Sequence, residues 1–213
     1  LGQLRRQRGG DGLPLGVLGE VGLGLAELGQ ARGLLLQALH ERVIRPREEL
    51  EHIIRASGDV TDQYEFVIVG SQSMLGPVPN PEPVFTVSME ADIYPLQAPE
   101  LADKIDGAIG EGSQFHLTYG YYAQGVGPET ALLPRDWMQR VHRIQNRNTQ
   151  DRIGYCLDVL DLFLAKAVAA REKDRAFCIA LLQHGYVELD AALVLVRNMP
   201  LDANEQQTLR ATI

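Results

Sequence analysis

The stretch Glu65-Phe66-Val67-Ile68-Val69-Gly70-Ser71 decides the fold of this chain. Its first five residues are mostly β-branched or aromatic, which is typical of a buried strand. Gly70 and Ser71 follow at once and predict a turn into a short helix that runs through Leu75. Glycine lets a phosphate approach the backbone closely, and the first turn of a helix presents free N–H groups to an anion. A strand ending in Gly-Ser is more often only a turn, so this signal needs a second one.

The second signal lies about twenty residues further along, in Ser88-Met89-Glu90-Ala91-Asp92-Ile93-Tyr94. We expect a strand from Val84 to Tyr94, whose side chains alternate between two faces. Glu90 and Asp92 then project together, while the apolar residues between them face the core. Two carboxylates on one half-buried face repel each other unless a cation neutralises them, and Mg²⁺ prefers oxygen ligands. A solvated outer face of the sheet would give the same pattern.

The rest of the chain predicts further strands followed by helices. Strand patterns within 115–125, 130–133, 140–144 and 155–157 alternate with short helices at 47–56 and 101–109, and the tyrosines at 119, 121 and 122 suit strand packing. Helical spacing then dominates over 158–170, 172–184 and 188–199, and Asp202 with Glu205 predicts a capping box. We therefore expect an α+β fold: a small mixed sheet flanked by helices, with a C-terminal helical part. The expected division is a loose Gly/Leu-rich segment at 1–45, an α/β core at 46–157 and the helical part at 158–213.

Composition narrows the class of protein. The chain has 213 residues, 45% of them hydrophobic, and a formal net charge of −8, ordinary values for a globular protein that buries a real core. The acidic balance argues against a general nucleic-acid coat protein, although it leaves room for a local basic site. Two cysteines exclude a disulfide framework, and no run of 18 apolar residues is present. We expect a cytoplasmic protein without a membrane partner.

The two signals together resemble the nucleotidyltransferase superfamily, which is related to DNA polymerase beta. Its signature is a Gly-Ser that opens a helix, followed by two acidic residues spaced two apart on the next strand. The resemblance implies that Gly70 and Ser71, with Ser73 of the same Gly-Ser-Gln-Ser motif, bind the nucleotide. It also implies that Glu90 and Asp92 are catalytic metal ligands.

The match is closer to a bacterial branch of largely uncharacterised nucleotidyltransferase-fold proteins. It extends over about residues 60–200 and leaves out the Gly/Leu-rich start. The further motifs that carry it are Ile105–Phe115, Gly120–Val126, Asp161–Lys166 and Arg171–Asp174. Related abortive-infection toxins place such a lysine and a Lys-Asp pair beside the nucleotide.

Three residues of the C-terminal part therefore enter the predicted site. Lys166 and Lys173 lie seven residues apart, so they would share one face of a continuous helix. The resemblance implies that both contact phosphates, and that Asp174 positions them or acts as a catalytic acid or base. Surface lysines on an amphipathic helix would show the same spacing.

The sequence departs from the superfamily pattern in two places. The loop between Ser71 and Glu90 is longer than in the minimal pattern. A third carboxylate, which usually completes the metal site and activates the attacking hydroxyl, is not obvious. Asp158 is our candidate for this catalytic role, with Glu129 second. If neither reaches Glu90 and Asp92, the protein binds a nucleotide without transferring it.

The predicted function is that of a metal-dependent nucleotidyltransferase. Two Mg²⁺ ions, which Mn²⁺ could replace, would hold an NTP such as ATP, and the acceptor hydroxyl would belong to RNA, for example a tRNA end, or to a protein. The resemblance also suggests a toxin–antitoxin or defence system with a cognate toxin or antitoxin partner. The alternative is an inactive nucleotide- or protein-binding module on the same fold. A third possibility, an interaction protein without a ligand, would leave the acidic pair far from Ser71.

Overall fold

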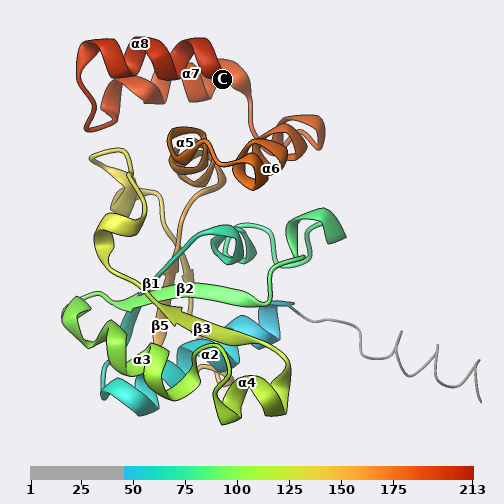
Figure 1. The fold of residues 1–213 in the computed structure, drawn as a ribbon, viewed down its shortest axis with the longest axis vertical. Helices are drawn as coiled ribbons and strands as arrows, with labels where there is room; N and C mark the ends of the chain where they lie inside the picture. Colours follow the sequence, from blue (N-terminus) through green and yellow to red (C-terminus); the bar gives the residue numbers. More distant parts are fainter. Residues whose placement is uncertain (1–45) are drawn as a thin grey trace, which may run out of the picture. The chain divides into compact units, whose positions relative to one another are not determined.

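The computed structural model describes residues 46–213, and the predicted loose segment at 1–45 lies outside this range. A five-stranded sheet forms the centre, in the order β3-β2-β1-β5-β4 (Figure 1). The strands are β1 (Glu65–Val69), β2 (Glu90–Pro95), β3 (Tyr122–Gly125), β4 (His142–Ile144) and β5 (Ile153–Cys156). β1 pairs antiparallel with β2 and parallel with β5, so the sheet is mixed and the predicted α+β class is confirmed.

Helices cover both faces of the sheet (Figure 1). On one side lie α2 (Pro46–Thr61), α3 (Ala102–Ile109) and α4 (Gln114–Tyr119). On the other lie α5 (Val159–Ala169), α6 (Glu172–Gln183), α7 (Leu189–Leu195) and α8 (Ala203–Thr212), of which α8 begins with the predicted Asp202–Glu205 capping box. The predicted boundaries between 1–45, 46–157 and 158–213 remain a prediction.

The central strand β1 is apolar along its length because it contributes to two cores. Phe66 and Ile68 pack with Ile54 of α2 and Ile105 of α3 in one cluster of buried residues. The alternate residues of β1 pack with the α5 and α6 residues of a second cluster. A strand covered on both faces needs no polar side chain, which explains why its sequence does not alternate.

The chain differs from prediction on either side of β2. Residues before Glu90 form a 3-10 turn, η2 (Pro83–Phe85), and an irregular segment instead of a strand that begins at Val84. The backbone carbonyl of Ser88 accepts a bond from the side chain of Gln72, and its hydroxyl bonds the backbone of Glu90. These bonds to side chains replace strand pairing over this segment.

Residues 115–119 are helical in α4, although a strand was predicted from Phe115. Ser113 caps this helix by accepting a bond from the His116 N–H, and Gly120 ends it in the left-handed region at φ 83°. Residues 130–133 form no strand; the short turn η4 (Pro128–Thr130) precedes an irregular segment. Local caps thus outweigh the strand preference of the aromatic residues here.

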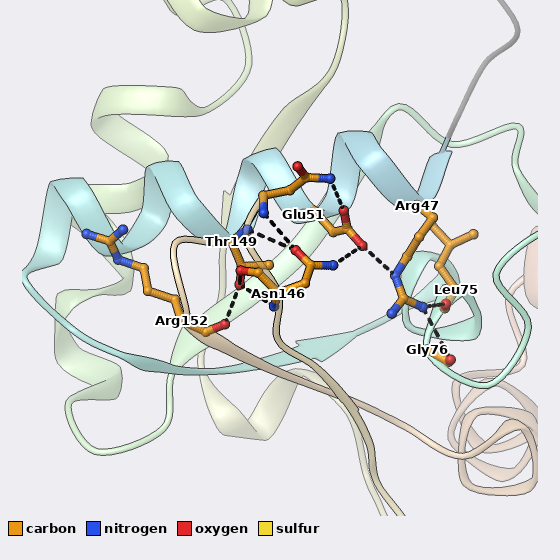
Figure 2. Close-up of polar contacts among 8 residues, drawn as sticks. Arg47, Glu51, Leu75, Gly76, Asn146, Thr149 and Arg152 are labelled. Atoms are coloured by element: carbon orange, nitrogen blue, oxygen red, sulfur yellow. Dashed lines mark hydrogen bonds and ion pairs between the residues drawn. The ribbon is translucent and has the colours of Figure 1, made fainter.

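A buried polar cluster fastens α2 to the loop between β4 and β5 (Figure 2). Glu51, only 5% exposed, accepts hydrogen bonds from Arg47, Asn146 and Asn148. Arg47 also donates to the backbone carbonyl of Leu75, at the end of η1 (Ser71–Leu75). The cluster therefore holds the far end of the turn that follows β1.

None of the helices within residues 46–213 combines the length and the apolar character needed to cross a membrane.

Candidate functional site

A cavity of about 940 Å³ lies at the end of β1 where the Gly-Ser turn begins. Six of the predicted site residues line it: Gly70, Ser71, Glu90, Asp92, Lys166 and Lys173. Ser73, Asp158 and Asp174 do not line it. The cavity also receives Gln124 of β3 and Arg171, which precedes α6. Segments that are widely separated in the sequence thus meet around one space.

The acidic wall of the cavity belongs to β2. Glu90 and Asp92 face the cavity, whereas Ala91 and Ile93 between them are buried in the core at 1% and 0% exposure. Asp92 is in register with Val69, so it lies beside the end of β1. No side-chain or backbone group in residues 46–213 donates a hydrogen bond to its carboxylate. The strand alternation read from the sequence is the one found here.

Burial and the neighbouring Glu90 raise the pKa of Asp92 to about 6. Lys166, Lys173 and Arg171 act in the opposite direction and only partly offset this shift. A carboxylate that is difficult to ionise, and that lacks a donor within the described chain, gains stability from an added cation.

Gly70 brings the backbone against this carboxylate. It adopts φ 65° and ψ −165°, a conformation that is essentially restricted to glycine. A Cβ atom at this position would overlap Asp92 Oδ2. Both the backbone angle and the space therefore require glycine.

The turn that follows Gly70 differs in detail from prediction. It is a five-residue 3-10 helix, η1, without a side-chain cap. Ser71 lines the cavity, but Ser73 is fully buried and its hydroxyl donates to the Gly70 carbonyl at 2.8 Å. Ser73 therefore stabilises the turn and has no contact with the cavity.

The cationic wall comes from the C-terminal helices. The cavity is lined by Lys166 of α5, by Arg171 immediately before α6 and by Lys173 of α6. The Lys166 ammonium lies 4.5 Å from the ring centre of Phe177. The sequence motif Arg171–Asp174 includes Arg171, but we predicted no role for this residue in the site. Its place in the cavity depends on how α5 meets α6, which sequence spacing does not give.

Asp174 supports this wall from behind. It is fully buried, and its carboxylate bonds Lys166 Nζ at 3.0 Å and Arg171 Nε at 2.5 Å. Burial acts to raise the pKa of Asp174, but the bonds from Arg171 and Lys166 outweigh it and hold the pKa below its usual value. Asp174 is therefore an ionised anchor that fixes two cations, and its oxygens do not reach the cavity.

Asp158 does not join Glu90 and Asp92. Its carboxylate caps α5 by accepting from the Leu160 N–H at 2.9 Å, and it also contacts His142 Nε2 at 3.0 Å. Asp158 follows β5, and β1 separates β5 from β2 in the sheet. Glu129 does not line the cavity either, and residues 46–213 contain no group of three His, Cys, Asp or Glu side chains placed to hold a metal ion.

The strand next to the acidic pair contributes two polar side chains that sequence reasoning missed. In the parallel pairing of β2 and β3, Tyr122 is in register with Glu90 and Gln124 with Asp92. The Tyr122 hydroxyl donates to Glu90 Oε2 at 3.1 Å, and Gln124 lines the cavity. Burial and the bond to Glu90 raise the pKa of Tyr122 to about 12, so it keeps its proton at neutral pH. Their spacing of two matches that of Glu90 and Asp92, but the register that brings the pairs together is not visible in the sequence.

These donors suit a hard divalent cation. Carboxylate, amide and hydroxyl oxygens of Glu90, Asp92, Gln124 and Ser71 are the ligands that Mg²⁺ and Mn²⁺ accept. The absence of a side chain at Gly70 makes room for the Asp92 carboxylate itself. The cationic wall suits the phosphates that accompany such a cation.

A comparison with protein-family models identifies the family of this chain. A family model described as a nucleotidyltransferase of unknown function (DUF6036) matches residues 47–208, which include every element of the sheet and the whole cavity. No curated protein gives a significant match to the chain. No solved structure does so either.

Proposed function

Because the chain belongs to this family of nucleotidyltransferases of unknown function, we propose that it transfers a nucleoside monophosphate from an NTP, such as ATP, to an acceptor hydroxyl. The observation that carries the proposal is Asp92. This carboxylate shares one cavity with Glu90 and three cationic side chains, and burial and Glu90 raise its pKa to about 6. An acidic wall that faces a cationic wall across one cavity is complementary to a metal–triphosphate complex.

Each wall has a distinct task in the proposed reaction. Glu90 and Asp92 would hold Mg²⁺ or Mn²⁺, and this cation would stabilise charge on the phosphate oxygens. Lys166, Arg171 and Lys173 would bind the triphosphate, while the Gly70 backbone and the Ser71 hydroxyl would border it.

The buried Asp174 is assigned a positioning task, because both of its oxygens are bonded to cations. The acid or base role that the resemblance left open is therefore not part of the proposal. Without Asp174, Lys166 and Arg171 would lose the carboxylate that orients them toward the cavity.

In the proposed reaction, the acceptor oxygen forms a bond to the α-phosphorus and the bond to the β-phosphate breaks. Pyrophosphate leaves, and the acceptor proton passes to solvent. The proposed acceptor is RNA, such as a tRNA end, or a protein side chain. The link to toxin–antitoxin or defence systems, and to a cognate partner protein, rests on resemblance alone.

The test is transfer of label from each of the four α-³²P NTPs to RNA and to protein in the presence of Mg²⁺ or Mn²⁺. We expect D92N to abolish transfer, because the amide removes half of the negative charge at the proposed cation site. The exposed helical residue Asp106 provides the matched control, and D106N should transfer label normally. Undiminished transfer by D92N would refute the assigned site.

One observation favours a second candidate, a nucleotide-binding module without transferase activity. The described residues around the cavity provide two carboxylates and no third. A thermal-shift series with each NTP, with and without Mg²⁺, separates the two candidates. Stabilisation without label transfer would support the module, and no response to any nucleotide would contradict both.

A further inference from the structure

The cross-strand pairs between β2 and β3 set the chemistry of the proposed cation site. Partners in register on parallel strands point to the same face of a sheet, and Asp92 and Gln124 accordingly line the same cavity. Gln124 is exposed and lines the cavity, and its side chain makes no hydrogen bond to another residue of the described chain. Its amide oxygen is therefore available to a ligand beside Asp92.

Tyr122 acts on the other member of the acidic pair. Its hydroxyl donates to Glu90 Oε2 at 3.1 Å, and its ring packs against the ring of His116 with a centre-to-centre distance of 4.7 Å and a tilt of 46°. The His116 ring in turn accepts a bond from the Gly112 N–H. One oxygen of Glu90 is thus held by a side chain whose own position is fixed, and the other oxygen is left for a ligand.

Charge decides how many cations these donors balance. Two carboxylates neutralise one divalent cation, and Gln124 adds an oxygen without adding charge. A second divalent cation would have only neutral protein oxygens and substrate phosphates, next to a wall that already carries Lys166, Arg171 and Lys173. The described residues provide no third acidic group to offset it.

We propose that the cavity holds one divalent cation instead of two, with Gln124 as a neutral oxygen ligand beside Asp92 and Tyr122 as a positioning residue for Glu90. This inference rests on the proposed function and departs from the two-ion arrangement that the resemblance implies. In this inference, the side chains of β3 determine how many cations the site binds.

The test counts bound Mn²⁺ on the full chain by equilibrium dialysis and elemental analysis, with and without inorganic tripolyphosphate. Tripolyphosphate supplies phosphate oxygens without assuming a base, and it equilibrates across the membrane, so the excess metal is bound to protein. We expect one Mn²⁺ per wild-type chain under both conditions. Two Mn²⁺ per chain would overturn this inference and leave the proposed function standing, whereas no bound Mn²⁺ would overturn both.

Variants of Gln124 test its role directly. Q124E adds the third carboxylate in register with Asp92, so we expect a second Mn²⁺ in the presence of tripolyphosphate. Q124L removes the oxygen and should weaken the single site about tenfold. The exposed Gln139 gives the control, because Q139E adds the same charge away from the cavity and should bind one Mn²⁺. A single Mn²⁺ on Q124E would contradict the assignment.

Tyr122 is tested with its neighbour as the control. Y122F should weaken Mn²⁺ binding about tenfold without changing the count, because an unsupported Glu90 must be ordered by the metal itself. The Tyr121 hydroxyl forms its hydrogen bond with His52 of α2, on the opposite face of the sheet from the cavity. Y121F should therefore leave the affinity for Mn²⁺ unchanged. Equal affinities for Y122F and wild type would remove Tyr122 from the site.

Discussion

Asp92 and Asp174 are the same residue type beside the same cavity, yet the protein treats them in opposite ways. The Asp174 side chain has no exposed surface, and two cations of the chain hold its pKa below the usual value. Burial and Glu90 raise the pKa of Asp92 to about 6 instead. Partners, not burial depth, decide the sign of each shift. The chain neutralises the carboxylate that supports the wall and leaves the one facing the cavity to a ligand.

The largest expected effect comes from removing the anchor. D174N leaves the nearly buried Lys166 ammonium without its counter-charge, which should lower the free energy of unfolding by about 3 to 5 kcal/mol. Urea unfolding measures this loss, and D106N at an exposed helix position should stay within about 0.5 kcal/mol of wild type. If D174N lowers the free energy of unfolding no more than the control does, Asp174 is not the stabilising partner of Lys166, and its contrast with Asp92 fails.

The second effect is a gain in the free energy of unfolding instead of a loss. Because the folded-state pKa of Asp92 is raised, its contribution to stability is present below the ordinary value of 3.8 and is lost as the pH rises through about 6. In EDTA, D92N should therefore become more stable than wild type between about pH 4 and 7, by at most about 3 kcal/mol before screening by water is allowed for.

Melting curves of both proteins across this pH range measure the difference. Adding Mg²⁺ at pH 7.5 should then stabilise wild type and leave D92N unchanged. If the difference in melting temperature between the two proteins is the same at every pH, Asp92 does not have the raised pKa described above.

The smallest effect concerns the space beside Asp92. G70A places an ordinary side chain in a conformation suited to glycine and against the Asp92 carboxylate, which should lower stability by about 2 kcal/mol. Chemical denaturation of G70A alone and in a D92A background separates the two causes. An identical loss in both backgrounds would show that the close approach contributes nothing and that the backbone angle accounts for the whole effect.

Local sequence patterns predicted the parts of the site that one element builds alone. Alternation along β2 placed Glu90 and Asp92 together, and a strand ending in glycine placed Gly70 beside them. The continuous helix expected for Lys166 and Lys173 is not found, because Ala170 adopts a left-handed conformation and ends α5. The two lysines line the cavity from two different helices. The mixed sheet also followed from the order of strands and helices.

The parts that depend on contacts between distant elements could not be predicted. Gln124 reaches Asp92 only through the register of β3, and a helix formed where Phe115 suggested a strand because Ser113 caps it. Asp158 has a plausible place in the sequence, but its carboxylate caps α5 and lies across β1 from the acidic pair. Strand register depends on tertiary contacts that a single sequence does not show, whereas the Ser113 cap is a local bond that competes with the strand preference of Phe115.

The pairing of β1 also bears on how the chain folds. Phe66 is opposite Pro95 on one side, but on the other it is opposite Gly154, far along the sequence. Closing that second, non-local pairing carries a larger entropic cost and should come later. The β1–β2 pair would then assemble first, so an incompletely folded chain would contain the acidic wall of the cavity before the C-terminal helices add the cationic wall.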